Sequence, residues 1–217
     1  MKLTHTTGPH QEQSIYTHGK PLAEAAGVMN LVHGRGATAQ SILTLGDELS
    51  HPKLAYLAPQ AAGNTWYPYS FLAPLENNEP YLSSALAAID DVVTQVEAAG
   101  ISADKLILAG FSQGACLATE YIARKAKRYG GLLVYSGGLI GPPDTPREYL
   151  GDLAGTPIFL GCSDVDFHIP KERVLESEAV LRGMGAEVTA KLYPNMGHTI
   201  NQDELAHGRE ILNTMMV

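Results

Sequence analysis

The chain has 217 residues, of which 45% are hydrophobic and 18% are charged, a balance typical of a folded globular protein. Its formal net charge of -8, without a basic stripe, argues against nucleic acid as a partner and against binding to an anionic membrane surface. A chain of this length suits one domain, so we expect residues 1–217 to form a single unit.

The first 20 residues are polar and contain no apolar stretch, so the sequence shows no signal peptide. No apolar run approaches the ~20 residues of a membrane span, and we expect no stable membrane insertion. The two cysteines, Cys116 and Cys162, lie in apolar surroundings and are expected to be free, which favours a reduced compartment. We therefore predict a cytoplasmic protein and leave a homodimer open.

Short apolar runs recur along the chain and predict buried strands of a parallel sheet. They cover 28–32, 54–58, 106–109, 132–135 and 158–160. Residues 186–193 differ, because apolar and polar side chains alternate there. This period of two predicts a strand near the edge of the sheet, with one face in water.

Helical spacing fills the segments between these strands. The stripes are Ile42–Leu45–Leu49, Leu82–Leu86–Ile89–Val93–Val96, Val174–Leu181–Met184 and Leu205–Leu212. Strands that alternate with helices predict an α/β fold with a mostly parallel central sheet flanked by helices. Two longer stretches break this rhythm, 59–80 with four prolines and several aromatic residues, and 136–155, which is rich in glycine and proline. Loops of this length in a compact domain are usually functional.

The strongest motif is Gly110-Phe111-Ser112-Gln113-Gly114, which follows a predicted strand and precedes a helical pattern. Gly-x-Ser-x-Gly in this context predicts a nucleophile elbow, a turn so tight that small residues must flank the serine on both sides. The serine then lies at a helix N-terminus, where negative charge is favoured. We expect Ser112 to be a catalytic nucleophile rather than part of a plain strand-to-helix turn.

A serine nucleophile needs an adjacent base, and in this fold an acid and then a histidine follow it along the chain. His198 lies after the edge strand and before the last helix, next to a glycine, which favours it as the base. The acid should lie after the strand at 158–160, where Asp164 and Asp166 compete. One of them should hold the histidine tautomer, while the other caps the loop or is solvated.

The oxyanion of an acyl-transfer reaction needs backbone N–H donors. One should come from Gln113, the residue after the nucleophile, and the other from the glycine-containing loop at 31–37. A phosphate-binding loop is the competing interpretation of the second segment, but no Gly-Lys-Ser/Thr or Gly-x-Gly-x-x-Gly pattern is present. We also expect no required metal, although His33, Asp166, His168 and His198 could converge, because no metal-ligand spacing is visible. No cofactor is predicted.

Several of these motifs together resemble the bacterial phospholipase/carboxylesterase family, which is similar to the acyl-protein thioesterases. The residues that carry the resemblance are spread from residue 31 to residue 200: His33-Gly34-Arg35-Gly36, Trp66, Gly110-Phe111-Ser112-Gln113-Gly114, Asp166-Phe167-His168-Ile169-Pro170 and Gly197-His198. The resemblance implies the α/β-hydrolase fold without a separate lid domain. It also implies hydrolysis of carboxylic esters through an acyl-enzyme on the serine.

The resemblance further implies roles for individual residues. It favours Asp166 over Asp164 as the acid, and it makes Arg35 and Gln113 the oxyanion donors. The chain departs from the family where Arg35 replaces a common apolar residue and Phe167 a common proline. We expect the substrate to contact four side chains, namely those of Trp66, His33, Phe167 and His168, with the alternative that Trp66 only anchors its loop.

These inferences predict a serine carboxylesterase with a catalytic triad of Ser112, Asp166 and His198. Its substrate should be a small-molecule ester or thioester with a small or medium acyl group. A non-catalytic binding protein of the same fold, or a lyase on the same scaffold, are the alternatives. The intact set of triad residues weighs against the first of these.

Overall fold

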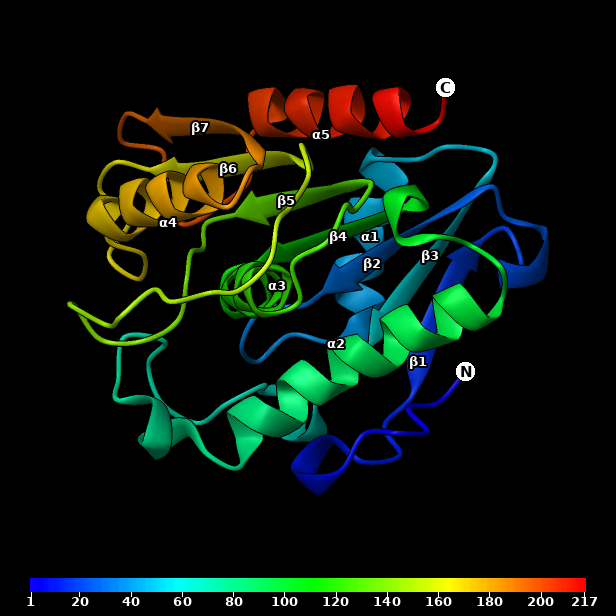
Figure 1. The fold of residues 1–217 in the computed structure, drawn as a ribbon, viewed down its shortest axis with the longest axis horizontal. Coiled ribbons are helices and arrows are strands. Elements are labelled where there is room, and N and C mark those ends of the chain that lie inside the picture. The colour runs from blue at the N-terminus through cyan, green and yellow to red at the C-terminus, as the bar shows by residue number, and fades with distance from the viewer.

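The computed structural model describes all residues from 1 to 217 and is built around one seven-stranded sheet (Figure 1). The strand order is β1-β3-β2-β4-β5-β6-β7, and every neighbouring pair is parallel except β1 with β3. The strands are β1 (Ile15–Gly19), β2 (Gly27–Val32), β3 (Leu54–Pro59), β4 (Leu106–Phe111), β5 (Gly131–Tyr135), β6 (Pro157–Ser163) and β7 (Glu187–Tyr193).

The central strands are buried on both faces, as their unbroken apolar runs predict. Every residue of β2, β3 and β5 is buried. The predicted edge strand is confirmed, because β7 pairs only with β6 and alternates between buried and more exposed positions along its first residues. This partly exposed pattern is what the alternation of apolar and polar side chains at 186–193 predicts.

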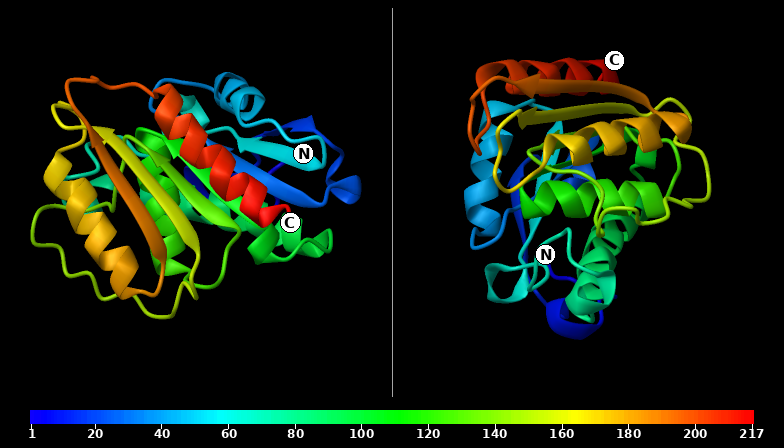
Figure 2. Two further views of the ribbon diagram at one scale, coloured as in Figure 1. Left: turned by 90° about the horizontal axis from the view of Figure 1, so that it is seen from above. Right: turned by 90° about the vertical axis from the view of Figure 1, so that its left-hand side faces the viewer.

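Helices cover both faces of the sheet, and an apolar layer lies between the sheet and the helices on each face (Figures 1 and 2). Helices α1 (Ala39–Glu48) and α5 (Gln202–Met215) pack on one face, over a core cluster of 17 buried residues. Helices α2 (Tyr81–Ala98), α3 (Gln113–Arg124) and α4 (Lys171–Gly183) pack on the other, over a cluster of 40. The second layer is therefore the main core. No helix combines the length and the apolar character that crossing a membrane requires.

One strand was not predicted. Strand β1 (Ile15–Gly19) runs antiparallel to β3 at the sheet edge, and Ile15 is its only buried residue. Since four of its five residues are at least partly exposed, the strand has neither an apolar run nor a clean alternation. The helix predicted from the stripe Val174–Leu181–Met184 begins at Lys171, with Pro170 at the N-cap position.

The sheet topology places the predicted motifs at one edge. The carboxyl ends of β2 and β4 lie side by side, with Val32 opposite Gly110, so the loop after β2 runs beside the turn that follows β4. The loops after β6 and β7 leave from the same edge, since these strands are also parallel neighbours. Ligands of open α/β sheets bind at this carboxyl edge.

Candidate active site

Ser112 occupies the sharp turn between β4 and α3. Its backbone has φ +56° and ψ -121°, a conformation that L-residues rarely adopt. The flanking glycines allow the turn to close. A Cβ on Gly110 would come within 2.5 Å of the Gly114 backbone, and one on Gly114 would clash with the carbonyl oxygen of Val32. Side chains at either position would force the elbow apart, which explains the Gly-x-Ser-x-Gly spacing.

Three side chains from separate loops form a continuous hydrogen-bonded row. His198 Nε2 lies 2.9 Å from Ser112 Oγ, and His198 Nδ1 lies 2.7 Å from Asp166 Oδ2. The histidine side chain is 15% exposed, and the aspartate side chain is fully buried. The structure therefore brings together the nucleophile, base and acid that the sequence predicted, in the arrangement of a Ser-His-Asp triad.

Asp166 is held as a carboxylate by several donors. Its Oδ1 accepts hydrogen bonds from the backbone N–H groups of His168, at 2.8 Å, and Ile169, at 3.1 Å. Burial acts to raise the pKa of Asp166, but the hydrogen bond with His198 and the two backbone donors outweigh it and lower the pKa. An ionised Asp166 can accept a hydrogen bond from His198 Nδ1–H, which leaves Nε2 unprotonated and able to act as a base.

Asp164, the competing acid, faces another loop. Its Oδ1 accepts a hydrogen bond from the Asn195 N–H at 2.9 Å, and its own N–H donates to the carbonyl of Tyr193. It therefore braces the segment that leads to His198 without touching the imidazole. This matches the loop-capping alternative of the sequence analysis.

The first turn of α5 anchors the other end of the His198 loop. Asn201 caps the helix by accepting hydrogen bonds from the N–H groups of Asp203 and Glu204, at 2.8 and 3.0 Å. In return, Glu204 Oε2 accepts a hydrogen bond from the Asn201 N–H at 2.8 Å, which completes a capping box. Glu204 is fully buried, and its second oxygen has no hydrogen-bond partner.

Two backbone N–H groups beside Ser112 have no acceptor within the protein. They belong to Arg35, in the loop after β2, and to Gln113, the first residue of α3. The N–H groups of the next two loop residues are occupied, since Gly36 donates to Asn64 and Ala37 to Gly34. Unpaired donors beside a nucleophile are what stabilisation of an oxyanion requires.

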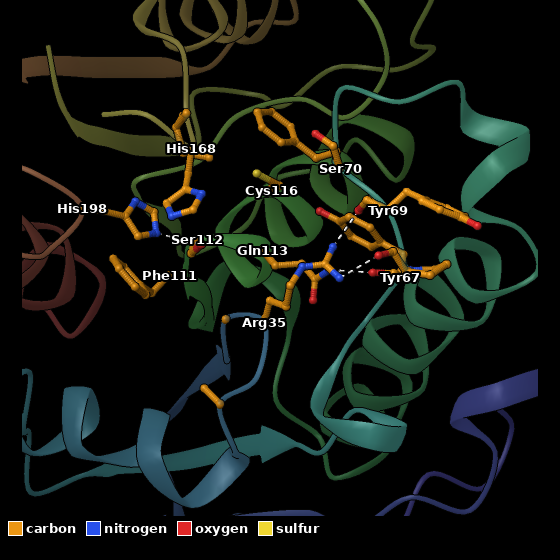
Figure 3. Close-up of a pocket in the computed structure, with 15 residues that line it drawn as sticks. Arg35, Tyr67, Tyr69, Ser70, Phe111, Ser112, Gln113, Cys116, His168 and His198 are labelled. Atoms are coloured by element: carbon orange, nitrogen blue, oxygen red, sulfur yellow. Dashed lines mark hydrogen bonds between the residues drawn. The ribbon is translucent and has the colours of Figure 1, made fainter. Parts of the chain in front are cut away.

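The side chains of the same two residues bind the backbone of the 59–80 loop. Gln113 Nε2 donates to the carbonyl of Tyr67 at 2.8 Å, and its Oε1 accepts from the Trp66 N–H at 2.9 Å. The Arg35 guanidinium donates to the carbonyls of Pro68, at 2.9 Å, and Tyr69, at 2.6 Å. The loop is thus attached to both sides of the predicted oxyanion site (Figure 3).

The structure corrects the expectation that Trp66 and His33 contact the substrate. Both are fully buried, and neither lines the cleft at Ser112. The Trp66 indole N–H donates to the His33 carbonyl at 2.9 Å, so this residue anchors its loop, as the alternative held. His33 Nδ1 faces the Gly34 carbonyl and its Nε2 accepts from the Ala61 N–H, while burial lowers its pKa. A neutral imidazole with both nitrogens occupied has a structural role.

Phe167 and His168 have different surroundings. Phe167 is 81% exposed and does not line the cleft, which corrects its assignment as a substrate contact. The centre of its ring lies 4.6 Å from the centre of the His168 ring. His168 does line the cleft, with its ring edge-on to His198 at 4.8 Å. No group of three or more histidine, cysteine, aspartate or glutamate side chains is arranged to hold a metal ion.

A cleft of about 620 Å³ opens beside Ser112, within the range of small-molecule sites. The 59–80 loop, which we expected to be functional, forms one wall of the cleft with its segment 67–71. Outside the predicted loops and site residues, three more residues line the cleft: Phe111, Cys116 and Ile169. Cys116 follows Ser112 by four residues on α3, so helical spacing could have placed it on the same face.

A second groove of about 500 Å³ meets the first along Gly34, Ala37, Phe111 and His198. It runs between α1 and the start of α5, and Ile42, Leu45 and Leu205 contribute its apolar surface. The Ser112–His198 pair therefore lies where two grooves join.

A mostly parallel sheet with a strained serine after β4, an aspartate after β6 and a histidine after β7 defines the α/β-hydrolase fold. The family model for Phospholipase/Carboxylesterase matches residues 19–216, and the chain belongs to that family.

Comparison with individual proteins agrees with this membership. The crystal structure of a phospholipase/carboxylesterase from Dyadobacter fermentans is 43% identical, covers 95% of this chain and 97% of its own, and superimposes with a TM-score of 0.89. Acyl-protein thioesterase 1 of Gibberella zeae is 29% identical over 53% of this chain and 50% of its own. A probable carboxylesterase, SOBER1-like, of Arabidopsis thaliana is 26% identical over 60% of this chain and 50% of its own. The chain thus aligns with about half the length of these curated relatives.

Proposed function

We propose that the protein is a serine carboxylesterase that hydrolyses small or medium acyl esters or thioesters through an acyl-enzyme on Ser112. The observation that carries the proposal is the hydrogen-bonded row from Ser112 through His198 to Asp166, set at the carboxyl edge of the sheet. Relatives named as carboxylesterases and acyl-protein thioesterases support this class of substrate. A cleft of about 620 Å³ suits an acyl group of limited size.

In the first half of the proposed reaction, His198 Nε2 takes the proton of the Ser112 hydroxyl as the oxygen attacks the carbonyl carbon. Negative charge forms on the carbonyl oxygen, and the unpaired N–H groups of Arg35 and Gln113 are placed to bind it. His198 then gives its proton to the departing oxygen or sulfur. The products of this half are a free alcohol or thiol and an ester on Ser112.

Water completes the cycle. His198 takes a proton from water as it attacks the acyl-enzyme, and returns that proton to Ser112 Oγ when the carboxylic acid leaves. The buried carboxylate of Asp166 fixes the imidazole tautomer and stabilises the imidazolium in both halves.

The test is covalent labelling combined with turnover. A fluorophosphonate probe should label the wild-type protein, and Ser112→Ala should abolish labelling and reduce kcat by several orders of magnitude while circular dichroism stays native. A panel of aryl esters from acetate to palmitate, with matching thioesters, defines the acyl preference. A folded protein that neither reacts with the probe nor hydrolyses any member of the panel would instead be a binding protein.

A further inference from the structure

The charge of Arg35 is not neutralised within the protein. It takes part in no ion pair, whereas five other arginines lie within 3.5 Å of a carboxylate oxygen: Arg124, Arg147, Arg173, Arg182 and Arg209. None of the 15 residues that line the cleft is aspartate or glutamate. In a chain with a net charge of -8, the cleft therefore holds an isolated positive charge. A local positive charge of this kind attracts anions to a protein surface that is otherwise negative and repels them.

The guanidinium is also held in place. Its hydrogen bonds to the carbonyls of Pro68 and Tyr69 use two of its five N–H groups, and its carbon lies 5.9 Å from the centre of the Tyr67 ring. The remaining N–H groups are free for a ligand, since Arg35 is exposed and lines the cleft. A fixed guanidinium loses little conformational freedom when it binds a carboxylate, which favours recognition.

The position of the triad indicates whether the acyl group or the leaving group of the substrate lies near the Arg35 charge. His198 must protonate the leaving group, so the leaving group lies beside the imidazole and the acyl group points away from it. Figure 3 shows His198 and the Arg35 side chain on opposite sides of Ser112. The second groove flanks His198 with Thr199 and Ile200 and suits an apolar leaving group. Arg35 thus faces the acyl half.

We infer that Arg35 makes the enzyme selective for esters whose acyl chain carries a negative charge, of which the half-ester of a dicarboxylic acid is the simplest. The inference rests on the proposed esterase function and names its substrate class. The reaction consumes one water, splits the single ester bond, and releases an alcohol and a dicarboxylate, while the distal carboxylate stays unchanged beside the guanidinium.

The test compares matched esters. We would measure kcat/KM for phenyl hydrogen adipate and for the neutral phenyl heptanoate, and for the shorter pair of phenyl hydrogen glutarate and phenyl hexanoate. The wild type should prefer the anionic member of a pair, and Arg35→Gln should lower the ratio of anionic to neutral kcat/KM by about 10- to 100-fold, the scale of a hydrogen bond to a charged group. Arg35→Lys should retain part of the preference, and added salt should weaken it.

Arg128→Gln is the matched control, because Arg128 also donates only to backbone carbonyls, those of Ala154 and Gly155, and lines neither groove. It should leave the ratio unchanged. If Arg35→Gln does not fold, inhibition of the wild type gives the answer instead: adipate should compete with a neutral ester, and neutral adipamide should compete far less.

The outcomes separate the inference from the proposed function. Wild-type protein that reacts with fluorophosphonate and cleaves neutral esters, but shows the same ratio in Arg35→Gln and no inhibition by adipate, overturns the inference and leaves the esterase standing. An effect confined to esters of 4-hydroxybenzoate, which carry the charge on the leaving group, overturns the assignment to the acyl side. Absence of both labelling and turnover overturns both.

Discussion

The buried carboxyl of Glu204 should make the stability of the protein depend on pH near neutrality. Glu204 is fully buried, with one oxygen bound to the Asn201 N–H and the other without a partner. Burial raises the pKa of Glu204 to about 7, against the opposing hydrogen bond from Asn201 and with a further rise from the charge of Asp203. Folded protein therefore keeps this proton over a pH range in which the unfolded chain has lost it.

The direction of the effect follows from that difference. The stabilising contribution of the Glu204 proton is complete below pH 4.5, the ordinary value for the carboxyl, and is lost as the pH rises to about 7. At about 1.4 kcal/mol per pH unit, the loss over this range is about 3 kcal/mol. Above about pH 7 the contribution of Glu204 to stability no longer changes with pH.

Glu204→Gln removes the titration and keeps an oxygen that can accept from Asn201. The variant and the wild type should melt at similar temperatures at pH 5. At pH 8 the variant should melt higher by about 6–12 °C, since 1 kcal/mol corresponds to about 2–4 °C in a protein of this size. Differential scanning calorimetry from pH 5 to 8 measures the difference, with Glu76→Gln, an exposed position, as the control. A Tm difference between Glu204→Gln and wild type that stays constant across this range would refute the reasoning.

Three further changes test the site. Asp166→Asn should lower kcat by roughly 10⁴, the scale of a wrong histidine tautomer, and Asp164→Asn should lower it far less. Steady-state kinetics measure both variants, and a larger loss in Asp164→Asn would mean that Asp164 is the acid. Trp66→Phe should cost about 1–3 kcal/mol in denaturant unfolding, because a buried carbonyl loses its donor, whereas unchanged stability with altered chain-length preference would make the indole a substrate contact. Gly114→Ala should abolish turnover or folding through its clash with Val32, and an active, labelled variant would show that the elbow can relax.

The sequence singled out Ser112 and His198 because their signals are local. Ser112 follows an apolar run and precedes a helical stripe, and the tight turn between them demands glycine on both sides. The choice between Asp164 and Asp166 could not be made locally. The two aspartates are only two positions apart in the sequence. What distinguishes their carboxylates is the direction of each side chain, toward His198 for Asp166 and toward Asn195 for Asp164.

The wrong assignment of Trp66 to the substrate pocket has a physical cause. Trp66 lies on a proline-rich loop, where an aromatic ring can face the ligand or the core with equal ease, and no periodicity tells which. Here the indole turns inward to the carbonyl of His33, and the backbone after it, from Tyr67 to Phe71, lines the cleft instead. Strand β1 was not predicted for a related reason, because a strand with one buried residue shows no alternation of apolar and polar side chains.

The attachment of the 59–80 loop to Arg35 and Gln113 has a consequence for protein engineering. The residues whose N–H groups flank Ser112 use their side chains to hold the loop by its backbone carbonyls, whatever side chains that loop carries. The side chains of Tyr69 and Ser70, which line the cleft, can therefore be changed without moving the N–H groups of Arg35 and Gln113. Transplanting a loop of different length would be far more disruptive, because a shifted backbone would move the N–H groups of Arg35 and Gln113 relative to Ser112.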